Sequence, residues 1–154
     1  GFVPQVIRGE KVPLAGAIQA ANEAQALSLP LYGRIAAGTP IEALRDNSST
    51  VDVPAGLLGN GEHYALEVAG DSMVDAGILD GDTVLIRRGD WGENGQIVVA
   101  RLHDEVTVKR FQRTGHRVEL IAENPAFKPI LVDLRRDALT IEGLCVGVIR
   151  AGHA

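Results

Sequence analysis

Short runs of Val, Ile, Leu and Thr, separated by clusters of Gly, Pro, Asn and Asp, make up the chain from Leu29 onward. This spacing is typical of an all-β domain. The pattern therefore predicts a mostly β fold, a multi-stranded domain with only short helical turns. The helical turn is expected at Ser72 to Ala76. The predicted strands are residues 31–36, 63–68, 83–87, 96–102, 105–112, 117–122 and 139–149.

The first 28 residues differ in character from the rest. Residues 14–27 are an Ala-rich run with Gln, Asn and Glu interspersed, compatible with either a loose helix or an ordered linker. Residues 1–13 carry apolar side chains in a segment too short to bury them by itself, so they are either the trailing edge of something upstream or a tail. We therefore divide the chain at residue 28 and place the main domain at 29–154.

Composition narrows the class of protein. A chain of 154 residues with 45% hydrophobic residues can bury the core of one domain. With 15 Lys plus Arg against 20 Asp plus Glu, the net charge is −5, and no basic stripe is present to meet nucleic-acid phosphates. Every apolar run ends well before the roughly 18 residues of a membrane span, and no secretory leader is visible. One cysteine and four scattered histidines offer neither a disulfide framework nor zinc spacing. We expect a cytoplasmic domain that binds neither DNA nor membrane and uses no metal or cofactor.

A serine stands where a predicted strand gives way to a turn. In Val68-Ala69-Gly70-Asp71-Ser72-Met73, the strand ends near Gly70 and Ser72 opens a short helical turn, with backbone N–H groups free nearby. This arrangement suits a nucleophile beside an oxyanion hole. It equally suits a serine that only caps the turn, which is the commoner role of such a residue.

A lysine is the candidate base for that serine. In the predicted strand 105–112, alternation puts Lys109 and Arg110 on opposite faces, so that one faces protein if the other faces water. For a lysine to act as a base near neutral pH, its pKa must fall by about 3 units from roughly 10.4. This shift corresponds to on the order of 4 kcal/mol, which burial can supply. The alternative is a pair of solvated charges that protects a strand edge.

The third feature is a run of small residues, Ala36-Ala37-Gly38, after the strand predicted at 31–36. Small side chains let a catalytic group approach the backbone closely, so the Ala37-Gly38 peptide bond would suit an attack by a nucleophile. An ordinary exit from a strand into a loop explains the run as well.

Taken together and in order, five segments resemble the carboxy-terminal domain of the LexA repressor family, which also includes UmuD and phage repressors. The resemblance covers about residues 29–150. The matching segments are Ile35-Ala36-Ala37-Gly38-Thr39-Pro40, Gly70-Asp71-Ser72-Met73, Asp104-Glu105-Val106-Thr107-Val108-Lys109-Arg110, Glu123-Asn124-Pro125 and Ile141-Glu142-Gly143-Leu144-Cys145-Val146-Gly147-Val148-Ile149-Arg150.

The resemblance implies a β domain of the type shared with signal peptidases, which cleaves its own chain with a serine-lysine dyad. By this resemblance Ser72 is the nucleophile, Lys109 the general base, Ala37-Gly38 the scissile bond, and the backbone at Asp71 and Ser72 the oxyanion site. It also implies a homodimer formed through residues 139–149, which we expect to be an apolar strand with an unpaired edge. Activation by the RecA filament on single-stranded DNA is implied as well. Operator DNA would be bound only by an amino-terminal winged helix-turn-helix, of which residues 1–28 hold a remnant and the linker.

Other functions remain open at this point. One alternative is a UmuD-like polymerase subunit or a phage repressor, which would have the same dyad in a protein with a different role. It is a dimerisation and docking module if Ser72 and Lys109 are only structural. A signal peptidase is disfavoured, because no membrane anchor is visible in this sequence.

Overall fold

The structure, a computed structural model, describes residues 5–8, 25–35, 39–40 and 49–150, so Ala37 and Gly38 lie outside the described residues. The described residues form strands and two short 3-10 helices, which confirms the mostly β prediction. None of their helices is long or apolar enough to cross a membrane. The elements are β1 (Gln5–Arg8), β2 (Ala26–Ile35), β3 (Thr39–Pro40), β4 (Thr50–Pro54), η2 (Ala55–Leu57), β5 (His63–Val68), η3 (Val74–Ala76), β6 (Thr83–Arg88), β7 (Ile97–Leu102), β8 (Glu105–Thr114), β9 (Arg117–Ile121), β10 (Ile130–Asp133) and β11 (Leu139–Arg150).

All seven predicted strands are present, as β2, β5, β6, β7, β8, β9 and β11. The predicted turn at Ser72 to Ala76 contains η3. Four strands were not predicted, namely β1, β3, β4 and β10, each of which has five residues or fewer. Strand β2 begins at Ala26, so the end of the Ala-rich run is neither helix nor linker.

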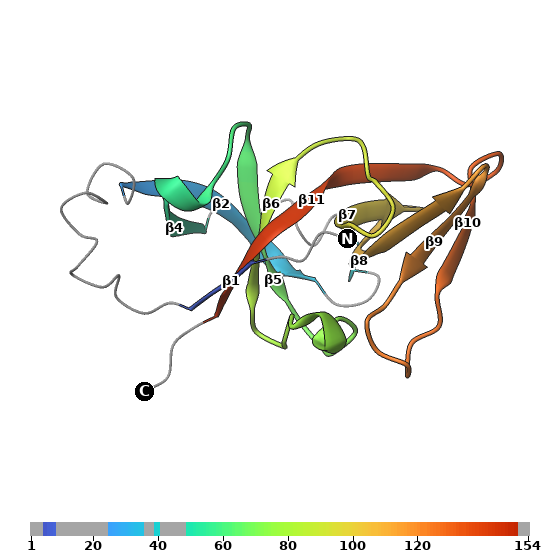
Figure 1. Ribbon diagram of the computed structural model, residues 1–154, viewed down its shortest axis with the longest axis horizontal. Coiled ribbons are helices and arrows are strands. Elements are labelled where there is room, and N and C mark those ends of the chain that lie inside the picture. Colours follow the sequence, from blue (N-terminus) through green and yellow to red (C-terminus); the bar gives the residue numbers. More distant parts are fainter. Residues whose placement is uncertain (1–4, 9–24, 36–38, 41–48, 151–154) are drawn as a thin grey trace.

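Strand β11 lies inside the sheet rather than at its edge. The strand order is β10-β9-β8-β7-β11-β6-β5-β2-β4, with β1 joined in parallel to β11 and β3 joined to β8. In Figure 1, β11 runs diagonally through the middle of the molecule, between the β9–β10 end and the β2–β4 end. The expectation of an unpaired edge along residues 139–149 is therefore wrong. Among the described residues, β6 pairs only with Gly143 to Ile149, which leaves 139–142 without a strand on that side.

The sheet curls around its largest core cluster. Side chains from β2, β5, β6, β7, β8 and β11 all meet in this one cluster, together with Met73 and Ile78 from the turn after β5. Strands that are four positions apart in the sheet order, β5 and β8, can share a core only if the sheet bends back on itself. The curl therefore brings the residues that follow β5 close to β8.

Two irregularities in β11 coincide with this curl. The register shifts between Ile141 and Gly143 against β7, and between Cys145 and Gly147 against β6. Such bulges bend a strand and increase its local twist. At Gly143 the backbone also approaches β6 so closely that a Cβ atom would lie 2.4 Å from Ile86 Cγ2 and 2.7 Å from the Arg87 carbonyl oxygen. Only glycine fits at this point of contact.

We predict that Gly143→Ala destabilises the domain by about 1–3 kcal/mol, because the added methyl group overlaps β6 and the backbone must move. Denaturant unfolding measures this change. Gly89→Ala is the matched control, since a Cβ atom there meets nothing within 4 Å. Equal stability of the two variants would contradict the close packing of β11 on β6.

Candidate active site

The turn that carries Ser72 is fixed at both ends by glycines and by acidic caps. Gly70 and Gly77 take positive φ angles of 85° and 82°, which glycine adopts without strain. The Gly70 N–H donates to Asp80 Oδ1 at 2.8 Å, and the Leu79 N–H donates to Asp82 Oδ2 at 2.6 Å. The turn after β5 is therefore held in one conformation.

The same turn is also held by contacts with the main core and by hydrogen bonds from Arg150. Met73 and Ile78, 1% and 0% exposed, bury the turn in the main core. The Arg150 guanidinium, at the end of β11, donates to the Gly77 carbonyl at 2.8 Å and makes two hydrogen bonds with buried Asp82. Ser72 itself is 8% exposed. A side chain held this firmly keeps its hydroxyl in a defined place.

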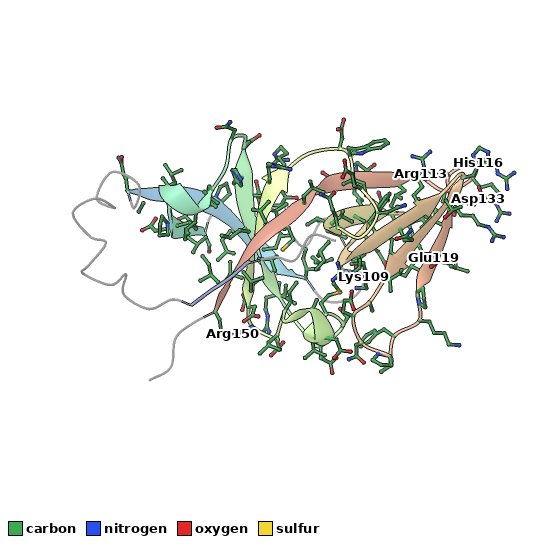
Figure 2. The ribbon with its side chains drawn as sticks, viewed as in Figure 1. Lys109, Arg113, His116, Glu119, Asp133 and Arg150 are labelled. Carbon is green, nitrogen blue, oxygen red and sulfur yellow. The ribbon has the colours of Figure 1, made fainter. Side chains whose placement is uncertain are left out.

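Lys109 reaches that hydroxyl from β8. Its Nζ donates to Ser72 Oγ at 3.3 Å, to Thr107 Oγ1 at 2.7 Å and to the Val108 carbonyl oxygen at 3.1 Å. Lys109 is 2% exposed and lies in the middle of β8, and Figure 2 labels it. The structure thus brings together the two side chains that the sequence singled out 37 residues apart.

Burial changes the protonation of Lys109. Loss of hydration penalises the ammonium form and lowers the pKa of Lys109 from 10.5 to about 8. The three oxygen acceptors match the three donors of an ammonium group, so they keep the charged form tolerable despite its burial. Near pH 7 a minor fraction of Lys109 is therefore uncharged and able to accept a proton, while most of it is protonated.

Two of the alternatives drawn from the sequence do not fit this geometry. The N-cap of η3 is Met73 and has no side-chain cap hydrogen bond, while the Ser72 hydroxyl faces Lys109 instead. Lys109 and Arg110 are not a solvated pair. Lys109 is buried and contacts Thr107 on its own face of the strand, and Arg110 on the other face is half-buried, where it pairs with Glu123 and the Gly95 carbonyl. The alternation predicted for this strand is confirmed.

The residues on either side of the predicted scissile bond are anchored next to the dyad. The Ile35 carbonyl, at the end of β2, accepts a hydrogen bond of 2.8 Å from the Ala69 N–H, three residues before Ser72. Thr39 and Pro40 pair with Val106 and Glu105 of β8, close to Lys109. The described residues before the segment 36–38 therefore lie near the turn that carries Ser72, and those after it lie on β8, the strand that carries Lys109.

Thr107 and Asn124 contact the site without having been assigned a role in it from the sequence. The buried Thr107 hydroxyl makes the shortest contact to Lys109 Nζ. Asn124 donates from Nδ2 to the Asp71 carbonyl oxygen at 2.9 Å. The alternation in β8 puts Thr107 on the same face as Lys109, and this signal could have found it. The position of Asn124 depends on contacts between distant segments.

Comparison with known proteins shows the family to which the chain is similar. The family model described as "Peptidase S24-like" matches residues 30–146. The LexA repressor of Gluconacetobacter diazotrophicus is 55% identical over 150 residues, which are 97% of this chain and 58% of that protein. The LexA repressor of Acidiphilium cryptum is 53% identical over 151 residues, 97% of this chain and 64% of that protein. The chain thus spans about three fifths of the length of these curated relatives.

We predict that Lys109→Met makes the domain more stable than the unsubstituted chain at pH 7, because no buried charge remains. The unfolded lysine holds its proton up to about pH 10.5 and the folded one only up to about pH 8. The unsubstituted chain should therefore gain up to about 3 kcal/mol of stability as the pH rises through this window, and the advantage of the variant should shrink equally.

The measurement is denaturant unfolding at several pH values, with both chains in a Ser72→Ala background so that no reaction of Ser72 intervenes. Comparing the two chains cancels the titration of other groups, such as Tyr64, whose pKa is raised by burial. A difference in stability that is independent of pH would contradict a depressed pKa at Lys109.

Proposed function

Because this chain belongs to the peptidase S24-like family, we propose that it is the self-cleaving part of a LexA-type transcriptional repressor. Its reaction is hydrolysis of its own Ala37-Gly38 peptide bond. Ser72 is the nucleophile and Lys109 the general base. No metal or cofactor takes part in this proposal. The buried contact of 3.3 Å between Lys109 Nζ and Ser72 Oγ is the observation that carries it.

The proposed chemistry is acyl transfer. The neutral Lys109 amine takes the proton of the Ser72 hydroxyl as Oγ attacks the Ala37 carbonyl carbon. The tetrahedral oxyanion is stabilised by the backbone N–H of Ser72, within the Asp71–Ser72 segment. Lys109 then gives the proton to the Gly38 nitrogen as the peptide bond breaks, and water hydrolyses the Ser72 ester. This route fits a chain whose residues on either side of 36–38 are tied to Ala69 and β8.

Protonation of Lys109 restrains this reaction. With a pKa of about 8, about one molecule in ten has a neutral Lys109 at pH 7. A second restraint is the position of the segment at roughly 34–47, of which residues 36–38 and 41–47 are not described. An activator acts by binding the reactive arrangement more tightly than the resting one, and a preference of about 2.7 kcal/mol raises the reactive population about 100-fold.

We infer the setting from the family. The protein acts in the cytoplasm in the SOS response to DNA damage, and the RecA filament on single-stranded DNA is the activator. Operator DNA is bound by an amino-terminal domain outside this chain, of which residues 1–28 are the remnant and linker. The protein is a homodimer through its carboxy-terminal strand. Among the described residues, 139–142 lie along β7 on one side and have no strand on the other, so this open side is the part of β11 that a second copy would use.

Two rival functions are separable by experiment. A UmuD-like subunit or a phage repressor shares the dyad and differs in what precedes it, so the full-length amino terminus decides between them. A docking module would not cut itself at all. The burial of a lysine against a serine favours the peptidase, because a merely structural site gains little from a charged group that must be desolvated.

We predict that the purified chain cuts itself between Ala37 and Gly38 on incubation at about pH 10, where Lys109 is neutral. The rate should rise with pH and level off above about pH 8, following the pKa of Lys109. Mass spectrometry of the fragments identifies the bond. A docking module would yield no fragments, and a flat rate between about pH 6 and pH 10 would contradict control by Lys109.

Ser72→Ala and Lys109→Ala are expected to abolish this cleavage while the fold remains. The role of each residue is tested by fragment analysis at the same pH, with circular dichroism as the control for folding. Cleavage at the normal rate in either variant would exclude the dyad.

A further inference from the structure

The segment Glu123-Asn124 docks directly on the turn that carries Ser72. The Asn124 side chain donates from Nδ2 to the Asp71 carbonyl oxygen at 2.9 Å, and the Glu123 carbonyl oxygen accepts from the Asp75 N–H at 2.8 Å. These two bonds lie on either side of Ser72 in the sequence. The turn is therefore held by a segment that does not itself belong to the proposed dyad.

The Asn124 contact acts on the peptide unit between Asp71 and Ser72. That peptide bond is trans, so its C=O and N–H groups point in opposite directions. The Asp71 carbonyl accepts two hydrogen bonds, from Asn124 Nδ2 at 2.9 Å and from the Val74 N–H at 3.3 Å, so Asn124 is the nearer donor. Fixing this carbonyl also fixes the direction of the Ser72 N–H. Among the described residues this N–H has no acceptor, as expected of a group kept for the oxyanion.

The docking segment is also tied to the strand of the base. Strand β9 ends at Ile121, which is paired with Arg110 of β8. The Arg110 guanidinium forms an ion pair with Glu123, and both side chains are 25% exposed. Arg110 directly follows Lys109, so one short segment contacts both the strand of Lys109 and the turn of Ser72.

We propose that Asn124 is a positioning residue for self-cleavage, which aims the Ser72 N–H at the oxyanion by holding the Asp71 carbonyl. This inference rests on the proposed function and adds a residue to it. Asn124 makes no hydrogen bond to the Ser72 hydroxyl or to Lys109 Nζ among the described residues. Its effect therefore belongs to the stabilisation of the oxyanion, and the protonation of Lys109 is independent of it.

The test uses Asn124→Ser. Asn124 has a second, local role, since its Oδ1 accepts the Ala126 N–H at 2.9 Å. A serine hydroxyl can accept the same bond in an equivalent turn, but it is too short to reach the Asp71 carbonyl. The substitution is neutral, so it adds no charge near Lys109.

Asn94→Ser is the matched control. Asn94 makes the same kind of two-point contact, accepting from the Arg113 N–H at 2.6 Å and donating to the Arg113 carbonyl at 3.1 Å. Its contacts are with Arg113, near the β8–β9 turn, which Figure 2 labels at the end of the molecule away from Lys109. Loss of these contacts should leave cleavage unchanged.

We expect Asn124→Ser to lower the plateau rate at high pH by about 10- to 100-fold, less than the loss of a whole oxyanion donor. The midpoint of the pH–rate curve should stay where it is in the unsubstituted chain. The proposal is overturned if Asn124→Ser keeps the plateau rate of the unsubstituted chain. It is also overturned if a shift of the midpoint accounts for the loss of rate, or if Asn94→Ser loses as much rate as Asn124→Ser.

A second measurement does not depend on cleavage. In ¹⁵N-labelled chain with Ser72 intact, at about pH 6 where Lys109 is protonated, Asn124→Ser should shift the Ser72 amide resonance and speed its hydrogen exchange, whereas Asn94→Ser should not. An unchanged Ser72 amide overturns the role of Asn124. If the unsubstituted chain does not cut itself at high pH, the proposed function fails, and the amide measurement still decides whether Asn124 fixes this N–H.

Discussion

The curl of the sheet is the constraint on which the site depends. Strands β5 and β8 are separated by β6, β11 and β7 in the sheet order. At the usual spacing between neighbouring strands, a flat sheet would keep them about 19 Å apart. In the structure, Ser72 Oγ and Lys109 Nζ are 3.3 Å apart. The common core, the two bulges of β11 and the tight contact at Gly143 all serve this approach.

The site balances two opposing effects on one amine. Burial removes water from Lys109 and favours the neutral form, whereas the oxygens of Ser72, Thr107 and Val108 support the charged form. Complete burial without acceptors would leave a permanently reactive base, and an exposed lysine would almost never be neutral at physiological pH. The intermediate pKa is compatible with a stable fold in which the proposed cleavage is slow.

The pattern of residues along the chain predicted the strands and the opposite directions of Lys109 and Arg110. The contact of Lys109 with Ser72 depends on the pairing of distant strands. Alternation in residues 105–112 was enough to put Lys109 and Arg110 on opposite faces, because side chains alternate in any strand. It could not show that the residues after β5 meet β8, since that follows from the strand order. For the same reason the central place of β11 and the contact of Asn124 with Asp71 were not predicted. Strand β3 has only two residues and ends in Pro40, so it carries no periodic signal.

Because of the pairing of β1 and β2, the proposed cleavage of the chain would not by itself separate the two products. Both strands precede Ala37, and they are hydrogen-bonded to β11, β4 and β5, which follow Gly38. Hydrolysis of the proposed Ala37-Gly38 bond would therefore leave a nicked but assembled domain, because β1 and β2 would still be paired with the rest of the sheet. The two products would come apart only when β1 is released from β11 and β2 is released from both β4 and β5. Until then the nick could be resealed by the reverse reaction, so the lifetime of this complex, as well as the rate of hydrolysis, would set when cleavage becomes irreversible.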